Sequence, residues 1–549
     1  MSQADSEYDH VVDVVVVGSG GAAFATAMGA ADEGLSVVMI ESTEKWGGST
    51  AMSGGGLWLP NNPLMQRAKA GDSREEALEY MEATIGDEGR AASRERKEAF
   101  VDGIADLVTT AEKYGMHFSR AGDYPDYYPE LPGGKIGRAV EAVPFDRKRI
   151  GEWWSTCRAM MPLPAKTDDV WLLERSWSTA GGFVRGAQFV GRIAGGLARG
   201  QRLVGLGGAL ACSLLDVVVG KQGVRLWLST PLEELLVEDG RVVGVRATRE
   251  GRPVTIRARR GVMLAAGGFD HNVDWRQKYH GIDGAPSGNP GNLGGPIALA
   301  HQLGAALELM DDAWWGASTA APAGGGPGFL VGERSLPYSI MVDARGERFA
   351  NESESYVDLG HHMLEHDKDG AYWLVADVRH ARRYLRSWAM DPRGAKAMAE
   401  AGILVKAGTI GELARKIGVD AAGLTATVDR FNGFARTGVD GDFGRGNSAY
   451  DRYYGDPTVH PNPNLGPLEK GQFTAVKVVI GDLGTKGGVL TDVDGRVLRE
   501  DGSVIAGLYA AGNTSASVMG RTYPGPGSTI GPATVFGLRA ARQMARAEA

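Results

Sequence analysis

The residues best suited to chemistry near the start of the sequence are a cluster of small ones. The run GSGGAA, residues 18–23, follows a stretch of valines and precedes an alanine-rich stretch. Glycines let the main chain turn tightly and approach a phosphate, and a helix N-terminus offers it unpaired N–H groups. Glu41 ends the next apolar run, where a carboxylate can accept hydrogen bonds from a ribose diol. The pattern predicts a dinucleotide site, formed by Gly18, Gly20, Gly21, Ala22, Ala23 and Glu41. The competing interpretation is a tight strand-to-helix turn without a ligand.

Phenols and backbone N–H groups are a second possible source of chemistry. Residues 123–134 break regular structure with proline and glycine while concentrating tyrosines, and such loops are more often packing than chemistry. Near the C-terminus, the run MGRTYPGPGSTIGP fixes the Tyr523 phenol relative to the N–H of Gly527, just before an expected helix. A phenol and an N–H held in this way can polarise a carbonyl group. The alternative for this stretch is a rigid helix-entry turn.

The elements that must position these groups are those of an α/β sheet. Val11–Val17 and Val37–Ile40 read as strands around an alanine-rich helix, which makes a βαβ unit. Residues 224–229, 232–237 and 241–248 read as strands with a hairpin turn. A further strand ends in the small residues around 266–268. The expected core is therefore a doubly wound sheet that binds its ligand at the strand ends.

Length and composition restrict the classes of protein that remain. A chain of 549 residues exceeds a single core, so we expect two domains. The net charge of -8 argues against nucleic-acid binding. Cys157 and Cys212 show no metal-ligand or disulfide spacing, so we expect no metal site. The polar N-terminus and the absence of a long apolar run favour the cytoplasm over secretion or a membrane span.

The glycine-rich motifs together resemble a known family. GSGGAA, then GGST-x-x-SGGG-x-W-x-P-N, and later TYPGPG are similar to flavoproteins related to fumarate reductase and succinate dehydrogenase, especially the 3-ketosteroid Δ1-dehydrogenases. The resemblance implies that the dinucleotide is FAD. Relatives that link FAD covalently carry a histidine where Ser49 and Thr50 stand here, which implies non-covalent binding. The further residues expected to hold it are Gly48, Ser49, Thr50, Ser53, Gly54, Gly55, Ala266, Gly267, Gly512 and Asn513.

The resemblance also implies a fold class, an α/β Rossmann-type FAD-binding domain with an inserted α+β catalytic domain. We expect the FAD-binding domain at 1–285 and 475–549, with an irregular segment at 151–215, and the catalytic domain at 286–474. Relatives generally show N-T-G-D-G near residue 292, whereas this chain has NLGGP at 292–296. That difference leaves the local flavin contact or helix start open.

For the reaction, the resemblance implies desaturation of the C1–C2 bond of a 3-ketosteroid, from the 4-ene to the 1,4-diene. Tyr523 and Gly527 would polarise the C3 carbonyl, Tyr356 would take the C2 proton with Tyr127 as hydrogen-bond donor or relay, and the C1 hydride would pass to flavin N5. Tyr338 competes with Tyr356 for the role of base, and the role of Tyr128 is open.

The partners expected are a steroid and an external electron acceptor such as a quinone or dye, because no second dinucleotide motif is present. In residues 183–204, Arg185, Arg192 and Arg199 recur every seven residues, with Phe189, Ile193 and Leu197 gathered on another helix face. This predicts either peripheral contact with the inner face of the membrane or an ordinary surface helix. Alternative functions are a Δ4-(5α)-ketosteroid dehydrogenase, an enoate reductase, and a flavin-bearing electron-transfer or sterol-binding protein.

Overall fold

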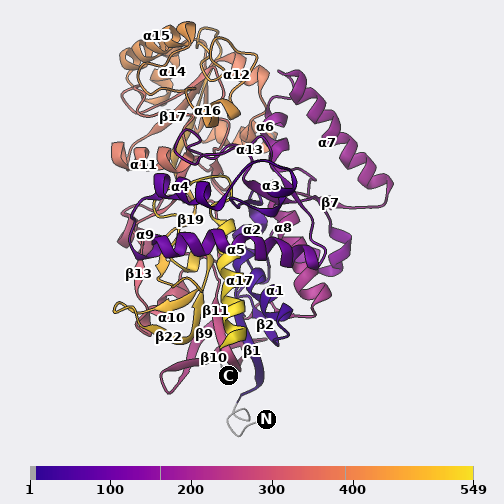
Figure 1. The fold of residues 1–549 in the computed structure, drawn as a ribbon. Coiled ribbons are helices and arrows are strands. Elements are labelled where there is room, and N and C mark those ends of the chain that lie inside the picture. The colour runs from indigo at the N-terminus through magenta and orange to yellow at the C-terminus, as the bar shows by residue number, and fades with distance from the viewer. Residues whose placement is uncertain (1–7, 161, 390, 548–549) are drawn as a thin grey trace.

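The computed structural model describes residues 8–160, 162–389 and 391–547, and two sheets organise them. The first sheet has the order β21-β22-β11-β1-β2-β8 and carries the β9–β10 hairpin on β11. The second has the order β15-β14-β19-β17-β16, with β12 and β18 also paired to β19. In Figure 1 the first sheet lies in the lower half of the molecule and the second in the upper half.

The first sheet is built on parallel strands that are buried on both faces. β1 (His10–Val17) pairs in parallel with β2 (Val37–Ile40) and with β11 (Arg252–Leu264). Their valine- and isoleucine-rich sequences suit this position, since such strands have no polar face. β22 (Val504–Ala510) extends β11 in parallel, so the C-terminal part of the chain completes a sheet begun at the N-terminus.

Two helices from opposite ends of the chain cover this sheet. α1 (Gly21–Asp32) and α17 (Ile530–Arg546) lie against each other, the second drawn in yellow in Figure 1. A Cβ on Gly29 would lie 2.5 Å from Leu538 Cδ1, so only glycine permits this approach. The alanines of α1 serve the same close packing.

The second sheet forms the core of the inserted domain. β14 (Ala313–Thr319) and β17 (Tyr372–Ala376) pair with β19 (Phe473–Thr485) in antiparallel fashion. β16 (Ser339–Val342) continues the sheet beyond β17, while α11 (Tyr356–Asp367) lies against β14. Helices α14 (Ile410–Ile417) and α15 (Ala421–Thr437) close the upper end in Figure 1.

A small third sheet lies beside α17. β5 (Ala139–Ala142) lies between β3 (Gly56–Trp58) and β4 (Phe118–Arg120), all antiparallel. Gly56, Glu141 and Ser119 stand directly opposite one another across the three strands. Directly opposed residues point to the same face of a sheet, so their side-chain positions share one face.

Residues 151–215 differ from the expected irregular segment. Their described part contains three helices, α6 (Thr167–Glu174), α7 (Ala180–Ala198) and α8 (Leu206–Leu215). Thr179 caps α7, and its hydroxyl accepts from Gly182 N at 2.9 Å. We expected irregular structure because glycines are scattered through this segment. That expectation was wrong, because each glycine destabilises a helix by only about 1 kcal/mol.

Candidate active site

The N-terminal glycine turn forms a cradle at the start of α1. Gly18 has φ +109°, and a Cβ there would lie 2.3 Å from the carbonyl oxygen of Ala265. Gly20 is the N-cap residue and offers no side chain to the first turn, which contains Ala22 and Ala23. Thr50 accepts from the N–H of Gly21, so among the described residues the N–H groups of Ala22 and Ala23 are the unpaired donors of this helix start, the kind of group that binds a phosphate.

Glu41 lies beside this turn with its carboxylate held in place. Its Oε2 accepts from Ser19 Oγ at 2.6 Å, and its Oε1 accepts from Thr43 N and Oγ1, both at 3.0 Å. A carboxylate has about four lone-pair sites, so Oε2 keeps capacity for a further donor. That capacity is what binding of a ribose hydroxyl requires.

The second glycine cluster packs against the first turn of α1. Thr50 in α2 (Gly48–Met52) accepts from Gly21 N at 2.9 Å through Oγ1. Ser49 Oγ accepts from Asn289 N at 3.0 Å and from Asn292 Nδ2 at 3.2 Å. Gly48 and Gly55 both have positive φ, and a Cβ on Gly55 would meet the main chain at Leu206. Later in the same loop, Ser53 Oγ accepts from Gly55 N, and Gly54 is exposed. The structure thus brings the two glycine clusters together.

Two later segments complete the same edge of the sheet. Thr514 Oγ1 accepts from Ala266 N and donates to Gly267 O, both at 2.9 Å. Gly267 has φ +80°, and a Cβ there would lie 2.3 Å from Asn292 Oδ1. Asn292 belongs to the NLGGP stretch, which differs from the N-T-G-D-G of relatives. A helix, α10 (Gly295–Gln302), still begins in this stretch. Nearby, Gly512 has φ +69°, and Asn513 Oδ1 accepts from Trp314 Nε1 at 3.3 Å.

The structure brings together three tyrosines that are far apart in the sequence. The ring centroids of Tyr127, Tyr356 and Tyr523 lie 5.0–5.5 Å from one another. All three side chains are buried. Within the described chain, the N–H of Gly527 donates no hydrogen bond, so it is available beside Tyr523. The four residues predicted to carry the chemistry therefore meet at the junction of the two domains.

Burial sets the protonation of this cluster. The pKa values of Tyr127 and Tyr356 lie well above the usual value of about 10, mainly because burial disfavours the phenolate and secondarily because the neighbouring phenols repel it. Tyr356 is the first residue of α11, so the positive end of a 12-residue helix lies at its backbone. The cluster alone therefore holds neutral phenols, with a helix dipole positioned to favour charge at Tyr356.

The loop that carries Tyr127 is fixed by a buried ion-pair network. Asp126 accepts from Trp58 Nε1 at 2.7 Å and from Arg138 Nη1 at 2.8 Å. Arg138 also pairs with Asp72 at 2.8 Å, and all three charged side chains are buried. Burial raises the pKa of Asp126 to about 6, even though Arg138 acts in the opposite direction.

Sequence reasoning missed part of this tyrosine cluster. The Tyr450 ring lies 4.4 Å from that of Tyr127, and Tyr124 OH lies 3.4 Å from Tyr127 OH. Tyr124 also contacts the hydroxyl of Tyr454 and stacks on Tyr453 at 4.5 Å. The signal available was the run AYDRYYGDP at 449–457, which concentrates phenols just as residues 123–128 do.

Of the two tyrosines whose roles were open, Tyr338 is separated from the cluster centre, whereas the Tyr128 hydroxyl lies beside the backbone of Tyr523. Tyr338 lies under the guanidinium of Arg379, with 4.5 Å from Cζ to the ring centroid, and the structure records no ring contact from it to Tyr127, Tyr356 or Tyr523 within the described residues. The Tyr128 hydroxyl donates to Asp358 Oδ1 at 2.9 Å. The geometry therefore favours Tyr356 over Tyr338 as a residue of this site.

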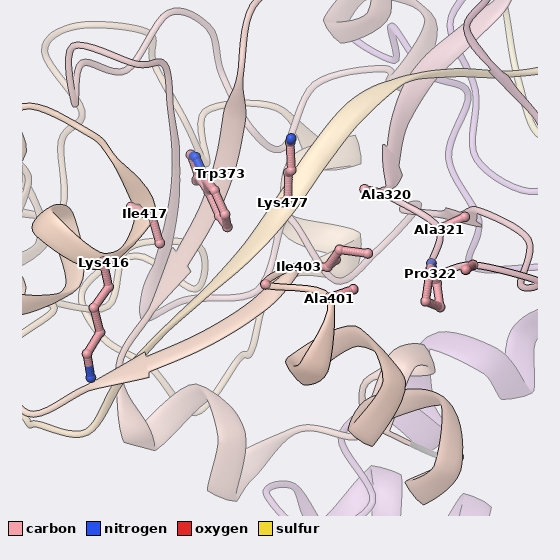
Figure 2. Close-up of a pocket in the computed structure, with 11 residues that line it drawn as sticks. Ala320, Ala321, Pro322, Trp373, Ala401, Ile403, Lys416, Ile417 and Lys477 are labelled. Carbon is pink, nitrogen blue, oxygen red and sulfur yellow. The ribbon is translucent and has the colours of Figure 1, made fainter.

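An open cleft of about 480 Å³ lies elsewhere, on the inserted domain. Figure 2 shows it between Trp373 and Lys477 of the sheet and the chain around Ala320–Pro322. None of the predicted site residues lines it. The cleft is thus separate from the tyrosine cluster.

Comparisons with known proteins identify the family of the chain. A family model described as FAD binding domain matches residues 13–530. A 3-oxosteroid 1-dehydrogenase of Mycolicibacterium smegmatis is 45% identical and covers 97% of each chain. A 4-oxocyclohex-2-ene-1-carboxylate 5-dehydrogenase of Sinomonas cyclohexanicum is 37% identical, covering 97% of this chain and 94% of the relative. The solved 3-ketosteroid delta1-dehydrogenase from Sterolibacterium denitrificans, in complex with 1,4-androstadiene-3,17-dione, is 36% identical with a TM-score of 0.92, covering 98% of this chain and 100% of that one.

These matches define an FAD-dependent oxidoreductase, and they confirm the predicted fold class, a Rossmann-type FAD-binding domain with an inserted catalytic domain. Within that class, the chain belongs to the 3-oxosteroid 1-dehydrogenase family. The cradle fits the cofactor, since an uncapped helix start, a held carboxylate and glycines with no room for a Cβ meet at one sheet edge.

The first prediction concerns Gly18. Gly18→Ala should abolish FAD retention, because its Cβ would overlap the Ala265 carbonyl at a φ unfavourable for alanine. The flavin absorbance of the purified protein measures this loss. Gly433→Ala is the matched control, since its Cβ would meet nothing within 4 Å. Full FAD content in Gly18→Ala would contradict the assignment.

The second prediction concerns Arg138. Arg138→Met should lower the free energy of unfolding by about 3–5 kcal/mol, because it leaves two buried carboxylates without their cation. Denaturant titration measures the change. Arg430→Met, which removes an exposed pair with Asp442, should change it far less, because water and salt screen an exposed pair. Equal effects of the two substitutions would show that the buried network does not hold the loop.

Proposed function

We propose that the protein catalyses the FAD-dependent 1,2-desaturation of 3-ketosteroids, from the 3-keto-4-ene to the 1,4-diene. The observation that carries the proposal is the convergence of three buried phenols and one free backbone N–H at the domain junction. Its support from comparison is a named steroid dehydrogenase similar over nearly the whole chain. Roles for the individual residues follow from the demands of the reaction.

The reaction first requires polarisation of the C3 carbonyl. The Tyr523 hydroxyl and the Gly527 N–H are donors on one rigid turn, and each preorganised donor of this kind typically contributes about 2.7–4 kcal/mol. Gly527 has φ +98°, and a Cβ there would lie 2.4 Å from the Gly56 carbonyl carbon. Only glycine can therefore present its N–H at this place.

The second requirement is a base for the C2 proton, which the polarised carbonyl makes more acidic. Tyr356 takes this role, although burial raises its pKa. The helix dipole of α11 stabilises the phenolate that the step needs. Tyr127, whose ring centroid lies 5.5 Å from that of Tyr356, is the proposed hydrogen-bond donor, and its hydroxyl lies 3.4 Å from that of Tyr124.

FAD, bound without a covalent link, supplies the acceptor for the two electrons. The chain's glycines and Glu41 bind and orient it, while the buried rings around Tyr356 exclude water from the reacting carbons. The partner that reoxidises it is an external acceptor of quinone or dye type. This part of the proposal is supported by the presence of one dinucleotide fingerprint in the sequence.

Two alternatives lie close in chemistry. Similarity to the cyclohexene-carboxylate dehydrogenase favours a smaller ketone as substrate, and a Δ4-(5α)-dehydrogenase would desaturate a different bond. Product analysis from a 3-keto-4-ene steroid, a 5α-saturated 3-ketosteroid and 4-oxocyclohexanecarboxylate separates the three. Formation of the 1,4-diene supports the proposal.

The third prediction tests the base. Tyr356→Phe should retain FAD but reduce turnover at least about 100-fold, the lower part of the range for general-base catalysis. Anaerobic addition of a 3-keto-4-ene steroid should bleach the flavin of the wild type and leave that of the variant oxidised.

Tyr338→Phe is the matched control and should bleach as the wild type does, because Tyr338 lies against Arg379. Normal bleaching in Tyr356→Phe would remove this residue from the base role.

We also propose that α7 contacts a membrane surface, where a hydrophobic substrate would be found. Arg185 and Arg192 turn inward to Asp169, the first at 3.1 Å and the second at 2.5 Å. The outward face instead repeats at positions 183, 187, 190, 194 and 197, and is entirely apolar. Figure 1 shows α7 at the outer edge of the molecule. In the part of the chain that is described, no helix is both long and apolar enough to cross a bilayer, so contact would be at the interface.

The fourth prediction concerns this outward face. Replacing Phe183, Val190 and Leu197 together with serine should reduce co-sedimentation with vesicles of phosphatidylglycerol and phosphatidylcholine. The side chains of all three are more than half exposed, so folding should not change. Val273→Ser, at an exposed valine of α9 (Val273–His280), is the control. Unchanged sedimentation of the triple variant would contradict membrane contact.

A further inference from the structure

A group of buried polar atoms beside the tyrosine cluster has no internal partner. Among the described residues, no hydrogen bond is made by Ser119 Oγ, Glu141 Oε1, Asp168 Oδ1, Trp171 Nε1 and Tyr453 OH. A buried polar atom without a partner destabilises a fold by about 1–3 kcal/mol. Five in one place therefore point to an external group that satisfies them.

These atoms belong to one cluster, although they come from four elements. Ser119 of β4 stands directly opposite Glu141 of β5. The Trp171 ring of α6 lies 4.5 Å from the Tyr453 ring of α16 (Ala449–Tyr454). Tyr453 in turn lies near the charges of Asp168 and Glu141, which add to the burial effect and hold its pKa well above the usual value. We call these five residues the polar cluster.

Hydrogen bonds to Thr167 orient Glu141. Glu141 Oε2 accepts from Thr167 N at 2.7 Å and from Thr167 Oγ1 at 2.9 Å. The other oxygen is left free and buried. Burial also raises the pKa of Glu141 to about 7 and that of Asp168 to about 6.

The third sheet relates this cluster to the proposed carbonyl-binding turn. Gly527 packs on Gly56 of β3, and the row Gly56, Glu141, Ser119 crosses three adjacent strands on one face. Along this row Glu141 lies one strand spacing, about 5 Å, from Gly56, and Ser119 lies two spacings, about 10 Å, from it. The rings of Tyr127, Tyr124 and Tyr453 are stacked in one row, which we call the aromatic wall. Successive ring centroids along this wall are 6.3 and 4.5 Å apart, so its two ends are separated by about the length of a fused four-ring skeleton.

From this arrangement, and resting on the proposed function, we propose that the polar cluster binds the polar substituent at the ring-D end of the steroid and prefers a hydroxyl there. A hydroxyl donates to the free oxygen of Glu141 and accepts from Tyr453 or Trp171. A ketone only accepts, so it leaves the carboxylate without a donor. The preferred substrates are 3-keto-4-ene steroids with a hydroxyl at C17.

The test compares kcat/KM for a 17β-hydroxy-3-keto-4-ene steroid with that for its 17-keto counterpart. Assays at about pH 8.5 keep both carboxyl groups ionised. The wild type should prefer the hydroxy steroid. In Glu141→Gln the amide oxygen can keep the two bonds from Thr167 while the NH₂ group replaces the free acceptor, so the preference should shift about tenfold toward the ketone.

Tyr453→Phe provides a second, independent variant that keeps the aromatic wall. It should lower kcat/KM for the hydroxy steroid by about two- to tenfold, the worth of one hydrogen bond. Tyr384→Phe is its control, because that buried hydroxyl donates to Asp456 in the inserted domain. FAD content and Tm establish that each variant is folded; if Glu141→Gln loses FAD, Tyr453→Phe decides alone.

The outcomes separate this inference from the proposed function. An unchanged hydroxy-to-keto ratio in the folded variants would mean that the polar cluster holds ordered water only, and would overturn the inference. Absence of turnover and of flavin bleaching with both steroids in the wild type would instead overturn the proposed function.

Discussion

The carbonyl oxygen of Pro524 is the atom on which the geometry of the tyrosine cluster depends. It accepts from Tyr127 N at 2.9 Å and from Tyr80 OH at 2.6 Å. The Tyr80 hydroxyl in turn accepts from Tyr128 N at 3.1 Å. Two loops separated by about four hundred residues are thereby fixed to each other, by one direct main-chain contact and by the buried Tyr80 hydroxyl that bridges them.

This arrangement is needed because burial raises the pKa of a phenol, so the phenolate that would act as the base is hard to form. A phenol contributes to proton transfer only if donors and dipoles compensate for the loss of water. In the proposed mechanism the compensation comes from fixed elements, namely the start of α11 and the free N–H of Gly527. Even small displacements of the Tyr127 loop would change these distances, which explains why a costly buried ion pair at Arg138 holds that loop.

The sequence was sufficient for local features and for those tied to a motif. The βαβ unit was predictable because the valine runs, the glycines and Glu41 succeed one another over a short stretch, and the hairpin at 232–249 because its strands are adjacent. Tyr127, Tyr356 and Tyr523 were found through resemblance. Tyr450 and the ring stack of Tyr124 on Tyr453 were missed, because contacts across more than 300 residues leave no periodic signal. The segment 151–215 was misread for the opposite reason, since its local composition suggested loops while packing against Asp169 supports helices.

Burial also accounts for the difference in hydrogen-bonding groups between the two ends of the aromatic wall, the row of Tyr127, Tyr124 and Tyr453. At the tyrosine cluster, most of the polar atoms are donors, which suits a carbonyl oxygen that gains negative charge. At the polar cluster, the free atoms include two carboxylate oxygens, which suit a donor and repel an acceptor. A 3,17-diketosteroid offers acceptors at both ends, so hydrogen bonding alone does not fix its direction, whereas a hydroxy ketone matches the wall in one direction only. The same buried charges that make the polar cluster unfavourable when empty would therefore orient the substrate with its C1–C2 bond at the tyrosines.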